Sequence, residues 1–124
     1  MNKLGLIAGN GSFPRLFAEN ARQLGYSVTA VAHKEETDPT LENAVDHFYW
    51  IALGQLGKLI EIFRAEGITK AVMIGGVKKT HLFSKVRPDI RGLSLLKRVL
   101  GHEDDILLRA IAEELEGEGI QIIE

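Results

Sequence analysis

Short apolar runs alternate with amphipathic segments along the whole sequence, and this alternation constrains the fold more than any other feature. Continuous apolar runs of about four to eight residues are typical of buried strands. Segments with apolar residues three and four positions apart indicate helices that bury one face. These patterns predict strands over Lys3–Ala8, Ser27–His33, Asp46–Ala52, Thr69–Gly75 and Ile120–Ile123. They predict helices over Pro14–Leu24, Gly54–Glu66, Leu93–Leu100 and Asp104–Glu116.

Strands that are separated by helices imply parallel βαβ units with right-handed crossovers. Continuously apolar strands are expected where helices cover both faces of a sheet. We therefore expect one Rossmann-like domain over residues 1–124, a three-layer α/β/α fold with a mainly parallel sheet of about five strands. The expected strand order is 3-2-1-4-5. Lys34–Asn43 and Val77–Ile90 are expected to be irregular connections.

The first predicted helix carries both a start and a stop signal. Pro14 fits the first helical turn, Ser12 is a candidate N-cap, and Gly25 follows as a stop. Helical spacing places on the inner face of this helix Leu16, Phe17, Asn20, Ala21 and Leu24. In the third predicted strand, Tyr49 and Trp50 are expected to pack in the core.

Two glycine-rich segments follow the first and fourth predicted strands. In the 3-2-1-4-5 order these strands are neighbours, and open α/β sheets bind ligands where the connections diverge between such neighbours. Glycine lets the backbone approach a ligand closely, and the N-terminus of the following helix favours an anion. The candidate phosphate-binding residues are therefore Gly9, Asn10, Gly11, Ser12, Gly75 and Gly76. The alternative is that the G-x-G pattern makes only a tight strand-to-helix turn.

A dinucleotide site is another interpretation of the first loop, and two features argue against it. Pro14 stands where the G-x-G-x-x-G pattern has a third glycine for close packing of helix and strand. The acidic residue expected after the second strand is also displaced, because His33-Lys34 precedes Glu35-Glu36. A dinucleotide-dependent oxidoreductase is thus the least favoured interpretation.

Three further segments carry candidate residues, and each has an ordinary structural explanation as well. The basic stretch Lys78–Asp89 would act as a clamp for a phosphorylated ligand or be a solvated loop. Gly54-Gln55 would either reach a substrate or begin a helix. Asp104-Asp105 would hold Mg²⁺ or position water, but acidic residues in a first helical turn also complement the helix dipole. Spacing alone favours this structural role for the two aspartates.

The composition excludes several classes of protein. The sequence has no cysteine, so disulfides, cysteine–zinc sites and a thiol nucleophile are excluded, and its four histidines are not spaced as a helical metal pair. A net charge of −2 speaks against a nucleic-acid partner. There is no apolar run of about 18 residues to span a membrane, and no signal-peptide pattern. We expect a cytoplasmic protein.

Several separated motifs resemble one known family. The sequence contains, in the order and spacing of that family, LGLIAGNGSFPRLFAENARQLGYSVTAVA, WIALGQLGKLIEIFRAEGITKAVMIGGV, RPD and DDILLRAIAEELEGEGI. From residue 3 to the end, the chain resembles the N-terminal half of the two-domain UDP-2,3-diacylglucosamine pyrophosphatases of bacterial lipid A biosynthesis. The resemblance implies Mg²⁺-dependent hydrolysis of UDP-2,3-diacylglucosamine to 2,3-diacylglucosamine 1-phosphate and UMP, at the cytoplasmic face of the inner membrane.

The resemblance also implies a division of labour between two domains. The ligand lies between them, and the acidic residue essential for catalysis belongs to the C-terminal domain, so the isolated chain is expected to be inactive. Ligand-side roles carry over to Gly9–Ser12, Gly54-Gln55, Gly75, Gly76, Val77, Lys78 and Asp104-Asp105. The sequence departs from the family at Gly76, where lysine is expected, and at His102-Glu103, where glycine is expected.

Two further expectations complete the sequence-based interpretation. The alternative function is a non-catalytic α/β module that binds a nucleotide or a sugar phosphate. An edge strand close to the C-terminus, with an apolar face normally covered by the second domain, would also favour a homodimer.

Overall fold

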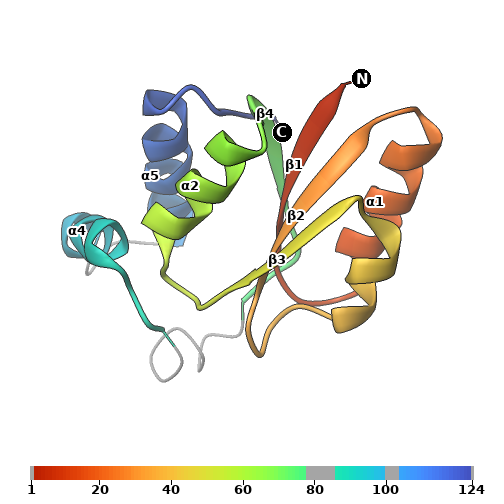
Figure 1. Cartoon of the computed structure of the whole chain (residues 1–124). Helices are drawn as coiled ribbons and strands as arrows, with labels where there is room; N and C mark the ends of the chain where they lie inside the picture. Colours follow the sequence, from red (N-terminus) through yellow and green to blue (C-terminus); the bar gives the residue numbers. More distant parts are fainter. Residues whose placement is uncertain (1, 78–85, 100–103, 124) are drawn as a thin grey trace.

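The computed structural model describes residues 2–77, 86–99 and 104–123 (Figure 1). Strands and helices alternate through most of the chain. In chain order they are β1 (Lys3–Ala8), α1 (Phe13–Gln23), β2 (Ser27–His33), the 3₁₀ helix η1 (Pro39–Ala44), β3 (His47–Ile51), α2 (Leu56–Ala65), β4 (Lys70–Ile74), α4 (Ile90–Val99), α5 (Asp104–Gly117) and β5 (Gln121–Ile122). The η1 helix overlaps the first predicted connection and ends one residue beyond it.

The five strands form one parallel sheet in the order β3-β2-β1-β4-β5, which confirms the predicted fold class and strand order. In the register, Gly5 of β1 pairs with Thr29 on one side and with Ala71 on the other. Because the chain moves to one side of β1 through β2 and to the other side through β4, the carboxyl ends of β1 and β4 form the topological switch point.

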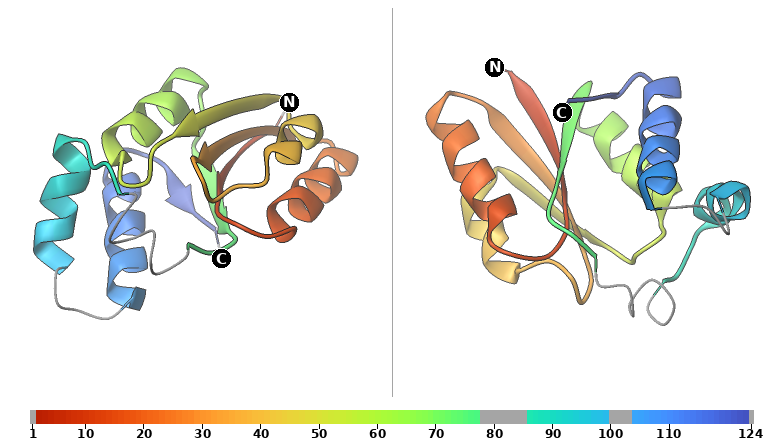
Figure 2. Two further views of the ribbon diagram at one scale, coloured as in Figure 1. Left: turned by 90° about the horizontal axis from the view of Figure 1, so that it is seen from below. Right: turned by 180° about the vertical axis from the view of Figure 1, so that it is seen from behind.

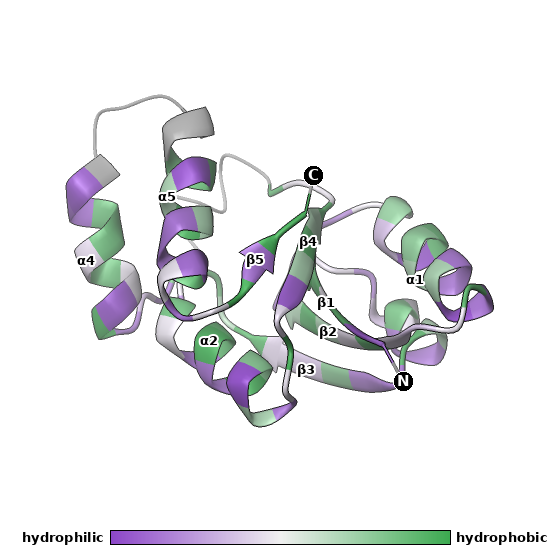
Figure 3. Ribbon diagram, turned by 90° about the horizontal axis from the view of Figure 1, so that it is seen from above, coloured by the Kyte–Doolittle hydropathy of each residue, from purple (hydrophilic) through white to green (hydrophobic). Residues whose placement is uncertain are grey.

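Two apolar clusters lie on opposite faces of the sheet (Figure 2). On one face α2, α4 and α5 pack around the fully buried Phe63. On the other face α1 and η1 cover the alternate residues of the strands, such as Leu6 and Val28. The alternation follows from strand geometry, because successive side chains point to opposite faces. The helices present polar residues to solvent (Figure 3), and none in the described ranges is long and apolar enough to cross a membrane.

The inner face of α1 differs from the prediction. Pro14, Ala18 and Ala21 are buried, whereas Leu16 is 50% exposed and Leu24 is 78% exposed. Asn20, predicted to face inward with them, is also exposed. The cause is the rotation of α1, which turns its small residues toward the sheet, where short side chains allow close approach. The prediction was right for Ala21 and for the partly buried Phe17.

Of two other local predictions, the N-cap position of Ser12 is confirmed, and the core position of Tyr49 and Trp50 is wrong. Ser12 occupies the N-cap position of α1, but its side chain makes no capping hydrogen bond, because its backbone is already helical with φ −94° and ψ −13°. Tyr49 and Trp50 remain more than a third exposed, because β3 is an edge strand. The Tyr49 hydroxyl donates to the Glu66 carboxylate, and the Trp50 ring packs edge-on against Phe48 with 5.1 Å between ring centroids.

Candidate functional site

The two glycine-rich loops meet at the switch point. The Gly9 N–H donates to the Ile74 carbonyl at 2.9 Å, and the Asn10 N–H donates to the Gly76 carbonyl at 2.8 Å. The Gly76 N–H donates in return to Asn10 Oδ1 at 3.2 Å. These bonds extend the pairing of β1 and β4 beyond the ends of the strands. The structure therefore brings four of the predicted site residues, Gly9, Asn10, Gly75 and Gly76, into one paired unit.

Close backbone approach explains why two of these positions are glycine. A Cβ atom on Gly9 would lie 2.4 Å from the Gly76 carbonyl oxygen, and one on Gly75 would lie 2.6 Å from the Asn10 carbonyl oxygen. Gly75 also has a φ of +97°, which L side chains rarely adopt. Gly11 differs, because no atom lies within 4 Å of where its Cβ would be. The glycines at 9 and 75 thus serve loop-to-loop packing, and Gly11 faces open space.

A buried polar cluster supports the paired loops from the end of β2. Asn10 Nδ2 donates to Glu36 Oε2 at 3.2 Å, and Glu36 is only 8% exposed. Thr37 Oγ1 accepts from the His33 N–H and donates to the Ala8 carbonyl, each at 2.9 Å. Every one of these residues lies at the carboxyl end of β1 or β2, so the cluster fixes the position of the first glycine loop. Sequence analysis missed two members of this cluster, Thr37 and Glu36, the latter set aside as a misplaced dinucleotide residue.

His33 contributes to this cluster as a neutral side chain. Its Nδ1 lies 2.8 Å from the Ala8 carbonyl oxygen, and because a carbonyl only accepts, Nδ1 carries the donated hydrogen. Nε2 is then the acceptor nitrogen of the ring. Burial lowers the pKa of His33, and the hydrogen bond to Ala8 and the charge of Glu36 oppose that effect only in part. At neutral pH the imidazole is therefore an uncharged positioning group.

The predicted ligand segment Gly54-Gln55 makes contacts that do not involve the paired glycine loops. Gln55 Oε1 accepts from the Ala52 N–H at 2.7 Å, so this side chain is used within its own turn. The closest atoms to a Cβ on Gly54 would belong to Val86 and Pro88, not to the glycine loops. β2 separates the strand that precedes this loop from β1. The structure does not join Gly54 and Gln55 to the paired unit, and their ligand role stays a prediction.

The Asp89 carboxylate accepts hydrogen bonds from the N-terminal ends of two helices. Its Oδ2 accepts from the Lys58 N–H of α2 at 3.0 Å, and its Oδ1 accepts from the Gly92 N–H of α4 at 2.8 Å. A Cβ on Gly92 would lie 1.8 Å from the Gly54 carbonyl oxygen, so α4 and the β3–α2 turn are also in direct backbone contact. The N-terminal position of α2, where an anion would otherwise bind, is thus filled by a carboxylate of the chain itself. The RPD motif, residues 87–89, ends on this residue.

The remaining predicted site residues are less fully defined. Val77 is half-buried directly after Gly76, and Ser12 is exposed at the start of α1. Asp104 and Asp105 open α5, as the helix-start interpretation predicted, but their side chains lie outside the described part of the molecule. Lys78 and the rest of the basic stretch through residue 85 also lie outside the described residues.

A magnesium site was tested against the donors that the structure describes. Among the side chains that the structure describes, which do not include those of Asp104 and Asp105, no three histidine or acidic groups are placed so that they could hold a metal ion. At the paired loops the nearest acidic group is Glu36, which already accepts the Asn10 amide. The described residues therefore do not form a metal site by themselves, and we derive no chemical step through a metal on this domain.

The paired loops at the switch point place the chain in the class of doubly wound α/β domains, which bind ligands at the carboxyl edge of a parallel sheet. The chain belongs to the LpxI N-terminal domain family, whose model matches residues 3–124. It is 34% identical over 127 aligned residues to the UDP-2,3-diacylglucosamine pyrophosphatase LpxI of Caulobacter vibrioides (strain ATCC 19089 / CIP 103742 / CB 15). That alignment covers 98% of this chain and 44% of the relative, so the chain spans less than half the relative's length. The resemblance inferred from the motifs is confirmed.

Proposed function

We propose that this chain is the ligand-binding N-terminal domain of a UDP-2,3-diacylglucosamine pyrophosphatase of lipid A biosynthesis. The reaction adds water across the phosphoanhydride of UDP-2,3-diacylglucosamine and gives 2,3-diacylglucosamine 1-phosphate and UMP. The observation that carries the proposal is the paired glycine unit at the switch point of a family member. A substrate with a UDP group and two acyl chains would place this domain on the cytoplasmic side of a membrane, in peripheral contact with it.

The paired loops are suited to an anionic group of the substrate. Gly11, Ser12, Gly75 and Gly76 are all exposed, and α1 begins directly after Ser12. The positive end of a helix dipole and the free N–H groups of a first turn stabilise a phosphate placed there. Since the loops are held by backbone bonds and by the Asn10–Glu36 contact, they are fixed before a ligand arrives. Pre-organisation of this kind lowers the free-energy cost of binding.

Binding and hydrolysis fall to different parts of the protein in this proposal. The described residues supply neither a metal site nor a carboxylate at the loops that is free of other contacts. We therefore assign the hydrolytic groups and Mg²⁺ to the portion of the longer family proteins that this chain does not span. Catalysis depends on holding reacting groups within a few tenths of an ångström of the productive geometry, so one domain alone should not suffice.

The isolated 124-residue chain is expected to show no turnover of UDP-2,3-diacylglucosamine in the presence of Mg²⁺, measured as release of UMP. The positive control is a full-length family member assayed under the same conditions. Substantial UMP release by the 124 residues would contradict the proposed division of labour.

A binding measurement separates the proposed function from a domain with no ligand. Titration with UMP and with UDP-glucosamine is expected to shift the backbone amide signals of Gly11 and Gly76 in nuclear magnetic resonance spectra. Signals of Gly117, at the end of α5, serve as the internal control. If neither ligand moves the loop signals, the assignment of the loops to the substrate fails. The non-catalytic module is favoured instead if the loops bind a ligand but the chain shows no activity when it is combined with the part of a family member that it does not span.

A further inference from the structure

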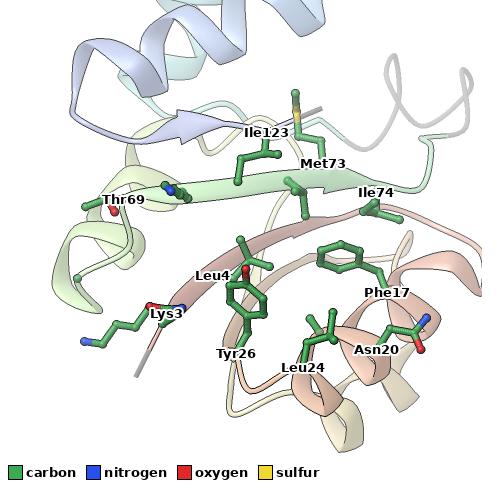
Figure 4. Close-up of a pocket in the computed structure, with 15 residues that line it drawn as sticks. Lys3, Leu4, Phe17, Asn20, Leu24, Tyr26, Thr69, Met73, Ile74 and Ile123 are labelled. Atoms are coloured by element: carbon green, nitrogen blue, oxygen red, sulfur yellow. The ribbon is translucent and has the colours of Figure 1, made fainter.

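A large apolar groove lies between α1 and β4 (Figure 4). Its volume is about 820 Å³. We call it the α1–β4 groove, and the apolar residues that define it are Leu4, Phe17, Leu24, Tyr26, Ile74 and Ile123. None of the described residues that line it is acidic. The lining also includes polar Asn2, Asn20 and Thr69 and basic Lys3 and Lys70. Its apolar residues suit an apolar chain, and a lining without described carboxylates does not suit a metal ion.

The groove exists because the two faces of the sheet are covered unequally. On the far face, α5 and α2 pack over β4 and β5 through residues such as Ala71 and Ile120. On the near face, Val72 and Ile74 of β4 pack against the cluster that includes α1, and no helix of the described residues lies beyond them toward β5. The apolar side chains of Leu24 and Ile123 consequently remain exposed at the rims of the groove.

The groove is continuous with the paired glycine loops. A second, more open hollow of about 520 Å³ shares Phe17 and Ile74 with it. This hollow extends past Phe13 and Leu16 as far as Gly75. Apolar surface therefore begins at one of the two paired loops and follows β4 toward its first residue, Lys70, where Lys3, Thr69 and Lys70 line the end of the groove. The five residues of β4 give this path a length of about 16 Å.

We propose that the α1–β4 groove binds an acyl chain of the substrate whose phosphorylated head group lies at the paired loops. The assignment rests on the proposed function, because it takes from it a ligand with a phosphate at one end and acyl chains at the other. The continuity of the apolar surface with Gly75 is the geometric observation that carries it. Exposed Phe13 and Leu16 form the entrance, and the chain runs along β4 toward Leu24 and Tyr26.

Two other occupants of this surface make different predictions. A second copy of the chain would cover the groove in a manner that depends on protein concentration and needs no ligand. A polypeptide segment of a longer family protein would cover it whether or not an acyl chain is present. Only an acyl-chain site makes the affinity for a phosphorylated ligand depend on the length of its apolar chain.

The test uses phosphorylated probes that differ only in their apolar part. Glycerol 3-phosphate, octanoyl lysophosphatidic acid and dodecanoyl lysophosphatidic acid are titrated into the 124-residue chain below their micelle-forming concentrations. Burial of one methylene strengthens binding by up to about fourfold. In a groove that is open along one side, the dodecanoyl probe is expected to bind at least about tenfold more tightly than the octanoyl probe. Methyl signals of Ile74 should shift, while those of Ile111 on the opposite face should not.

Two matched variants locate the effect. Leu16→Glu places a charge at the entrance of the groove, and Leu108→Glu places the same charge on α5, on the other side of the sheet. The two leucines are 50% and 52% exposed, so both substitutions should leave the fold intact, which thermal unfolding checks. Leu16→Glu is expected to remove the tenfold gain with chain length. Leu108→Glu is expected to keep it within about twofold.

Each contrary result overturns the assignment in a recognisable way. Equal affinity for all three probes, or no binding of the dodecanoyl probe, removes the acyl-chain site. If UMP still shifts the loop signals in that case, the proposed function stands without it. A gain with chain length that survives Leu16→Glu moves the site elsewhere on the molecule. Shifts of Ile74 that follow protein concentration without any probe assign the groove to a second copy of the chain.

Discussion

Replacing Gly9 by alanine is expected to separate the two glycine loops and to lower the free energy of unfolding by about 2 kcal/mol. The new Cβ would lie 2.4 Å from the Gly76 carbonyl oxygen and 2.8 Å from the Gly76 nitrogen. Both neighbours are backbone atoms, so no side chain can rotate away, and the loops must move apart. The midpoint of thermal unfolding should fall by roughly 8 °C. Differential scanning calorimetry measures both quantities.

The same substitution is expected to weaken UMP binding by about tenfold, equivalent to about 1.4 kcal/mol. Separation of the loops disrupts the exchange of hydrogen bonds between Asn10 and Gly76 that positions the exposed N–H groups. Gly76→Ala is the matched control, because its Cβ would lie 3.4 Å from Asn10 Oδ1, a side-chain atom, and its φ is ordinary. If Gly9→Ala and Gly76→Ala behave alike in stability and binding, close packing of the loops is not what position 9 provides.

The topology of this protein follows from local pattern because each strand is built around a short apolar run and each predicted helix has a clear stop. Gly25 and Gly67 end α1 and α2 with positive φ angles of +94° and +73°. Strand order 3-2-1-4-5 is one of the common orders of right-handed βαβ units, and the observed sheet agrees with it. The position of the switch point, and with it the meeting of Gly9 and Gly75, was therefore predictable from sequence.

The rotation of α1 was not predictable, because its apolar stripe is wider than the surface it buries. Leu16, Phe17 and Leu24 belong to the same periodic pattern as Ala21, and periodicity does not reveal which part of a stripe contacts the sheet. In the structure, Ala18 and Ala21 make the close contact with the sheet, and larger side chains of α1 lie along the α1–β4 groove. The exposed leucines are thus evidence of an uncovered sheet face, which only the arrangement of all five strands discloses.

The supporting residues of the site were missed because each depends on a contact that is distant in sequence or on an unusual turn. Glu36 faces Asn10, 26 positions away, after a turn in which Glu35 adopts a φ of +68°. No local sequence pattern predicts a positive φ for a glutamate. Asp89 was noted only as part of a basic connection and of the RPD motif, with no role assigned to it, yet it binds the starts of two helices that are far apart in the chain. The signal that was available is the aspartate directly before a helical segment, a common N-cap.

Replacing Asp89 by alanine is expected to lower the free energy of unfolding by about 3 kcal/mol at pH 7, because the ends of α2 and α4 lose their cap together. Partial burial alone would raise the pKa of the Asp89 carboxyl, but N–H groups of Gly92, Lys58 and Gly57 donate to its charged form and hold the pKa below its usual range. A carboxyl whose pKa is depressed by folding stabilises the folded state above its unfolded pKa of about 4. That stabilisation declines as the pH falls from there through the lower folded value.

The difference in unfolding free energy between the native chain and Asp89→Ala should therefore be constant from pH 7 down to about pH 5 and shrink below about pH 4. Urea unfolding followed by circular dichroism measures it at each pH. Asp38→Ala is the control, because Asp38 caps only the short η1 helix through Thr40 and should cost less. Asp89→Asn keeps an acceptor oxygen without the charge. Its stability should therefore lie between that of the native chain and that of Asp89→Ala, and it should lack the acid-dependent loss. A difference that does not change with pH would show that Asp89 acts by shape alone, and that the junction of α2 and α4 does not depend on its charge.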